Sequence, residues 1–178
     1  MKLSNFVNVG FAIVVMTWIG SCSASAQIKP SEFAGEWSGS GTDRDSLFAS
    51  PQKTSCRSKI RSEGNRMINE MVCSGPSGVR KTMQLQITVN GNQITGDFVQ
   101  TTGTQPPEVR KGSVSGRSTG DSADIQFNFS GMMPSASGKL ILLNPSSYSI
   151  KMAAMGTSVM DVTFKKVGQP GRTSQVEQ

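Results

Sequence analysis

The stretch CRSKIRSEGNRMINEMVC runs from Cys56 to Cys73 and decides the fold. Gly64-Asn65 lies at its midpoint, and a glycine-asparagine pair favours the two-residue turn of a β-hairpin. A two-residue loop there sets Cys56 opposite Cys73 on neighbouring antiparallel strands. The same register sets Lys59 opposite Glu70, an opposite-charge pair of the kind that stabilises a cross-strand position. The sequence therefore predicts a hairpin whose register is fixed at both ends.

The two thiols of this hairpin are predicted to form a disulfide. Pairs alternate along an antiparallel ladder, and counting outward from the turn places Cys56 and Cys73 at a non-hydrogen-bonded pair, where Cα atoms lie about 4.5 Å apart. A disulfide spans that separation. Closing the loop stabilises the fold by about 3 kcal/mol in the chain-entropy model. Two buried free thiols are the alternative, which an oxidising compartment disfavours.

The N-terminal region predicts export. Residues 1–26 have the pattern of a secretory signal peptide, with Lys2, an apolar run from Val9 to Ile19 and the small-residue cleavage site Ala24-Ser25-Ala26. A second pattern, Ile19-Gly20-Ser21-Cys22, resembles the lipobox of bacterial lipoproteins, in which Cys22 would be acylated. The apolar run is shorter than the roughly 20 residues of a membrane-spanning helix, so we expect no transmembrane segment in the mature chain.

Alternation of apolar and polar residues recurs along the rest of the chain and predicts an all-β fold. The alternating segments are 33–41, 54–63, 66–74, 79–89, 92–101, 108–117, 123–130, 137–143, 148–154 and 158–167. A meander of about eight to ten such strands exposes two edges unless it closes, so we predict a single antiparallel up-and-down β-barrel over residues 27–167. A two-sheet β-sandwich is the alternative. Residues 168–178 are predicted to form a polar, flexible tail.

Composition argues against several classes of protein. The 178 residues include no histidine, which removes the commonest general base, the commonest zinc ligand and every imidazole-dependent triad. With no phosphate-binding glycine loop and no metal-spaced cysteine cluster, we expect no enzyme, no cofactor and no metal site. Asp43 and Asp45 are interpreted as a solvated turn. The basic face of Arg57, Lys59 and Arg61 is interpreted as a solubilising surface, and no nucleic-acid partner is expected.

A short motif carries a family resemblance. Phe33-x-Gly35-x-Trp37 opens the first predicted strand, and a glycine and a tryptophan at this spacing resemble the start of calycin-type barrels, the lipocalins and avidins. The motif is also similar to the opening of the Inh-type periplasmic metalloprotease inhibitors, whose early disulfide Cys56 and Cys73 would match. The tryptophans of an avidin biotin site are missing after Trp37, and so is the rest of the lipocalin signature. Biotin binding is therefore not implied.

These observations predict a non-catalytic binding module of the bacterial cell envelope. Inward-facing positions offer five side chains for a small apolar ligand: Trp37, Phe98, Phe127, Phe129 and Met152. Trp37 alternatively closes one end of the barrel. Methionines at other inward positions suit an adaptable cavity and equally fill an irregular core. If a ligand lies beside Trp37, its binding will quench the indole fluorescence.

A second hypothesis assumes the same barrel fold and assigns it a different function. A packed interior would indicate a protease inhibitor or another envelope-integrity or protein-interaction factor that acts through its loops. The expected partner is therefore a small apolar ligand or an envelope protein. The expected location is the periplasm or the extracellular space, or the outer membrane facing the periplasm if Cys22 is lipidated. Volume and lining of the barrel interior distinguish the two hypotheses.

Overall fold

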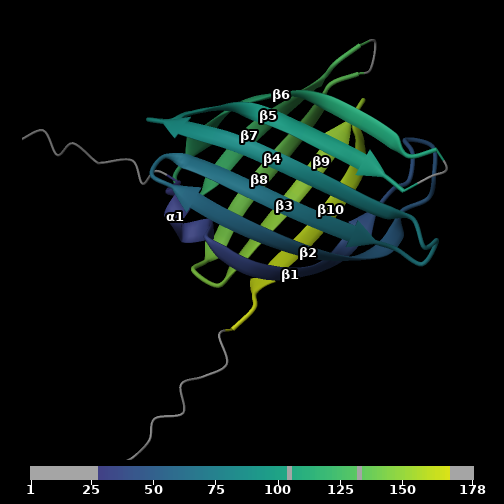
Figure 1. Cartoon of the computed structure of the whole chain (residues 1–178), viewed down its shortest axis with the longest axis horizontal. Helices are drawn as coiled ribbons and strands as arrows, with labels where there is room; N and C mark the ends of the chain where they lie inside the picture. The colour runs from purple at the N-terminus through teal and green to yellow at the C-terminus, as the bar shows by residue number, and fades with distance from the viewer. Residues whose placement is uncertain (1–27, 104–105, 132–133, 169–178) are drawn as a thin grey trace, which may run out of the picture.

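Ten antiparallel strands follow one another around a closed barrel in the computed structural model, which describes residues 28–103, 106–131 and 134–168 (Figure 1). Each strand pairs with its sequence neighbours, and β10 returns to pair with β1. The strands are β1 (Gly35–Asp43), β2 (Gln52–Glu63), β3 (Arg66–Ser74), β4 (Arg80–Asn90), β5 (Gln93–Thr102), β6 (Glu108–Thr119), β7 (Ser122–Phe129), β8 (Ala136–Asn144), β9 (Ser147–Ala154) and β10 (Thr157–Lys166). The predicted up-and-down barrel is confirmed, and the two-sheet sandwich is excluded.

The β2–β3 hairpin has the predicted register. Cys56 pairs with Cys73 and Lys59 pairs with Glu70. The disulfide is formed, with a Cα–Cα separation of 4.1 Å, which agrees with a close, non-hydrogen-bonded pair. The side chains of Lys59 and Glu70 do not form an ion pair with each other. Lys59 Nζ lies 3.5 Å from Glu36 on β1, and Glu70 pairs diagonally with Arg61.

Side chains alternate between the barrel interior and its outer face along the strands, with irregularities between Ser158 and Met160 on β10 and between Leu142 and Asn144 on β8. On β2 and β3 the buried positions are Thr54, Cys56, Ser58, Ile60, Met67, Asn69, Met71 and Cys73. Glycine permits close approach at inward positions: a Cβ on Gly41 would lie 2.0 Å from the carbonyl oxygen of Asp161, and one on Gly96 would lie 2.0 Å from that of Gln86. Such positions allow the strongly coiled sheet to close on itself.

A short helix closes one end of the barrel. Helix α1 (Pro30–Phe33) precedes β1 and lies at the left end in Figure 1. Proline presets the first-turn dihedral of a helix, so Pro30 starts this turn and carries Phe33 inward. Trp37 Nε1 donates a hydrogen bond of 2.7 Å to the Phe33 carbonyl oxygen. The prediction of strand from residue 33 is therefore wrong by two residues, because Phe33 ends a helical turn and β1 begins at Gly35.

Some predictions concern residues that lie outside the described ranges. They are the signal peptide over 1–26, the lipidation of Cys22 and all of the predicted tail except Gly168. Within the described ranges, α1 has four residues, and no helix there has the length and apolar character required to cross a membrane.

Candidate functional site

A cavity of about 350 Å³ occupies the end of the barrel opposite α1. It lies where β1, β3, β5, β7 and β9 end and where β4, β6, β8 and β10 begin. Its volume falls at the lower end of the range of small-molecule sites, about 300 to 1,000 Å³. The barrel is therefore neither a hollow tube nor a completely filled core, since one half is packed and the other half is open.

Apolar side chains form much of the wall of this cavity. Those that line it include Met71, Met83, Phe129, Met152 and Met160. Flexible thioethers from four strands, together with one aromatic ring, give a wall that can adapt to an apolar molecule. The disulfide also contributes, because Cys73 lines the cavity beside Met71.

The predicted ligand residues divide between the two halves of the barrel. Phe129 and Met152 line the cavity, whereas Trp37, Phe98 and Phe127 do not. The ring of Phe98 packs edge-on against Phe127 at 5.4 Å and against Phe129 at 5.1 Å, so these rings form a packed layer next to the cavity.

Trp37 belongs to the closed half. Its side chain is 1% exposed and packs edge-on against Tyr148 at 4.7 Å, while Tyr148 stacks on Phe164 at the same separation. Phe33 completes this aromatic cluster at 5.6 Å from Tyr148. The position of Trp37 thus fits its alternative interpretation as a residue that closes one end of the barrel.

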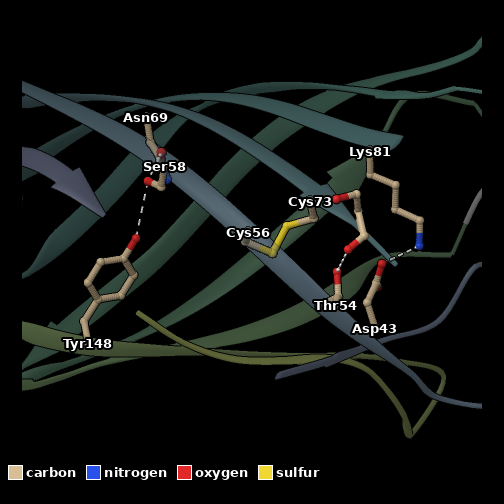
Figure 2. Close-up of a disulfide and its surroundings, with 9 residues drawn as sticks. Asp43, Thr54, Cys56, Ser58, Asn69, Cys73, Lys81 and Tyr148 are labelled. Atoms are coloured by element: carbon tan, nitrogen blue, oxygen red, sulfur yellow. Dashed lines mark hydrogen bonds and ion pairs between the residues drawn. A yellow bond between two sulfur atoms is a disulfide. The ribbon is translucent and has the colours of Figure 1, made fainter. Parts of the chain in front are cut away.

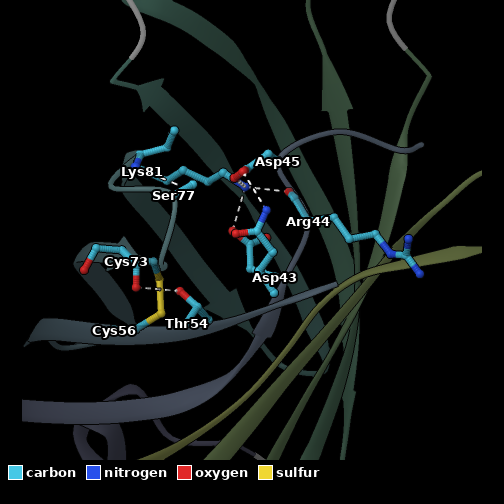
Figure 3. A network of polar contacts seen from close by, with 11 residues as sticks. Asp43, Arg44, Asp45, Thr54, Cys56, Cys73, Ser77 and Lys81 are labelled. Carbon is cyan, nitrogen blue, oxygen red and sulfur yellow. Dashed lines mark hydrogen bonds and ion pairs between the residues drawn. A yellow bond between two sulfur atoms is a disulfide. The ribbon is translucent and has the colours of Figure 1, made fainter. Parts of the chain in front are cut away.

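An ion pair crosses the inside of the cavity mouth. Lys81 Nζ lies 2.6 Å from Asp43 Oδ2 and 3.4 Å from Asp45 Oδ1, and it also donates a hydrogen bond to the Arg44 carbonyl oxygen (Figure 3). Lys81 and Asp43 occupy inward positions on β4 and β1, with β2 and β3 between them. Their side chains are only 12% and 14% exposed. Interpreting Asp43 as part of a solvated turn is therefore wrong, because the curvature of the barrel brings a lysine to it.

The β1–β2 loop forms one side of the mouth. Arg44 Nε donates to the Ser158 carbonyl oxygen at 2.8 Å, and Arg44 Nη1 donates to the Ala49 carbonyl oxygen. The first bond ties the loop to the start of β10, and the second joins two residues within the loop. Leu47 and Phe48 from this loop line the cavity, yet Phe48 is 97% exposed. The loop therefore presents an aromatic ring to solvent beside an apolar cavity.

A polar network lies in the packed half of the barrel (Figure 2). Ser58 Oγ donates to Asn69 Oδ1 at 2.7 Å, and the Tyr148 hydroxyl donates to Ser58 Oγ at 3.4 Å. Burial raises the pKa of Tyr148 well above its ordinary value, and the hydrogen bond with Ser58 opposes this rise. The network satisfies buried polar groups. The sequence analysis did not identify this network, although a polar residue at an inward position, such as Ser58 two residues after Cys56, was an available signal.

The described residues contain no cluster of three or more histidine, cysteine, aspartate or glutamate side chains that could bind a metal ion. Comparisons with known proteins find no matching family and no matching curated protein.

Proposed function

We propose that this protein binds a small apolar ligand in the open half of its barrel, without catalysing a reaction, after export to the bacterial cell envelope. The single observation that carries the proposal is the methionine-rich cavity of about 350 Å³. A cavity of this kind excludes water from the apolar part of a ligand, and burial of that surface contributes about 25 cal/mol per Å².

Export is supported by the covalent structure and the N-terminal sequence. The Cys56–Cys73 disulfide is of a kind that persists in oxidising compartments and is rare in the cytosol. Residues 1–26 carry the pattern of a secretory signal. Together these features favour the periplasm or the extracellular space.

Displacement of a fluorescent dye tests ligand binding. We expect 1-anilinonaphthalene-8-sulfonate to bind with a saturable signal and dodecanol to displace it. Trp37 is not the reporter of choice, since it packs in the closed half; quenching of its fluorescence is not required. Absence of saturable binding for dodecanol and for other apolar probes would contradict the proposal.

A matched pair of variants locates the site. Ala154 faces the cavity on β9, and Ala153 is its neighbour on the outer face of the same strand. We expect Ala154→Phe to fill the cavity and weaken dodecanol binding at least tenfold, while Ala153→Phe leaves it unchanged. Equal effects of the two substitutions would place the bound dodecanol elsewhere.

A loop-mediated protein contact is the second candidate, and the exposure of Phe48 favours it. Exposed aromatic side chains are common anchors of protein interfaces. If the protein is a protease inhibitor, stoichiometric inhibition of a secreted protease will be lost in Phe48→Ser, whereas Ala154→Phe will retain it. Inhibition that survives Phe48→Ser would argue against this loop as the contact.

A further inference from the structure

The cavity mouth has a polar arc and an apolar arc. Along β4, β5 and β6, inward polar side chains line it: Lys81, Gln100, Thr102 and Arg110. Across the mouth, β8, β9 and β10 contribute apolar side chains: Ala136, Met152, Ala154, Val159 and Met160. A molecule seated here would contact hydrogen-bond donors on one side and hydrocarbon on the other.

Arg110 contributes available hydrogen-bond donors to the polar arc. Its Nε and Nη2 atoms lie 2.8 and 2.7 Å from the same carboxylate oxygen, Glu108 Oε1. A guanidinium group has five N–H donors, so Glu108 orients the side chain and leaves other donors available. The Arg110 side chain is 31% exposed, which keeps it partly desolvated at the mouth.

Gln100 supplies a second donor beside Arg110. The two residues are directly paired across β5 and β6, so their inward side chains are neighbours. Gln100 is half-buried, and its side-chain amide makes no hydrogen bond within the part of the chain that the structure describes. The amide therefore lines the cavity with donors that a ligand can use.

Lys81 is not available as a cation for a ligand that lies against the polar arc. Its ammonium group is occupied by Asp43, Asp45 and the Arg44 carbonyl oxygen. The donors that remain for a ligand on this arc are therefore those of Arg110 and Gln100, together with the hydroxyl of Thr102.

From this arrangement we infer that the ligand is amphipathic, with an anionic end group that accepts hydrogen bonds from Arg110 and Gln100 and an apolar body that lies against Phe129 and the methionines. The inference rests on the proposed function and names its ligand class. Charge-assisted hydrogen bonds are about twice as strong as neutral ones, so an anionic end group should be preferred over an uncharged one of equal chain length.

Isothermal titration with dodecanoate and dodecanol at pH 8, below their aggregation concentrations, tests the inference. We expect the wild-type protein to bind dodecanoate about tenfold more tightly than dodecanol, as one charge-assisted hydrogen bond would give. We expect the double variant E108Q/R110Q, which leaves the net charge of the mouth unchanged, to bind both probes equally. Gln100→Leu should weaken dodecanoate binding several-fold and leave dodecanol binding unchanged.

A matched control removes an arginine from the outside of the same end. Arg80 is exposed on the outer face of β4, and we expect Arg80→Met to retain the tenfold preference. Equal wild-type affinity for the two probes, or a preference that survives E108Q/R110Q, would overturn the anionic subsite while leaving the apolar cavity proposal intact. Failure of both probes to bind would overturn both proposals. Circular dichroism melts of each variant establish that it is folded.

Discussion

Reduction of the Cys56–Cys73 disulfide should lower the free energy of unfolding by an amount set by the length of the loop that the bond closes. The bond closes a loop with a sequence separation of 17 residues. In the chain-entropy model such a loop restricts the unfolded chain by about 10.5 cal/mol/K, which is about 3 kcal/mol at 25 °C. Both cysteines are 2% exposed in the oxidised protein, so we expect the reduced thiols to remain in the interior and the loss of the crosslink to be separated from any loss of packing. We therefore expect the reduced protein to be folded and less stable by about 3 kcal/mol.

Urea unfolding with and without a phosphine reductant measures this difference. Because the reduced unfolded chain is more expanded, the slope of free energy against urea should rise on reduction. Cys56→Ala combined with Cys73→Ala serves as a second variant, and it should lose more stability than reduction because it also removes the sulfur atoms from the core. A difference below about 1 kcal/mol in the free energy of unfolding between the oxidised and reduced wild type would refute the view that the disulfide stabilises the barrel by restricting the unfolded chain.

Three further predictions concern the barrel. Gly41→Ala should destabilise the fold by about 3 kcal/mol in urea unfolding, because its Cβ would meet a β10 carbonyl oxygen at 2.0 Å; wild-type stability would mean that β1 and β10 are not so close. Burial raises the pKa of Tyr148, so the unfolded chain loses this proton first, near pH 10, and stability should fall by about 1.4 kcal/mol per pH unit above that value. Tyr148→Phe should remove this part of the alkaline loss, and an unchanged pH profile would contradict the assignment. Lys81→Met should cost about 3 kcal/mol by leaving Asp43 buried and unpaired, and the double variant with Asp43→Asn should cost less; additive losses would show that the pair is not coupled.

The strands and the hairpin register were predictable because both depend on local patterns. Alternation with a period of two identifies an inward and an outward face without any knowledge of the neighbours. The turn at Gly64-Asn65 fixes which residue faces which, so Cys56 and Cys73 follow from counting. Closure follows from the cost of two open edges. Each of these inferences uses residues that are close in the sequence or directly paired.

Contacts across the barrel interior were not predictable in this way. Lys81 and Asp43 meet inside the mouth although two strands separate them, and their meeting depends on the radius and tilt of the closed sheet. Tyr148 on β9 reaches Ser58 on β2 for the same reason, with β10 and β1 between them. The division into a packed half and an open half also depends on summed side-chain volumes, so the alternation that identified Trp37 and Phe129 as inward could not assign them to different ends.

Methyl NMR of the methionines gives a direct test of ligand binding in the open half of the barrel. Met71, Met83, Met152 and Met160 line the cavity, whereas Met67 is buried in the closed half, where it lies with residues of α1. In protein labelled with ¹³C at the methionine methyl groups, titration with dodecanoate should shift the four cavity signals and leave Met67 unchanged. We expect saturable shifts confined to these four methyl groups. Unchanged cavity signals at saturating dodecanoate, or shifts centred on Met67, would contradict this expectation.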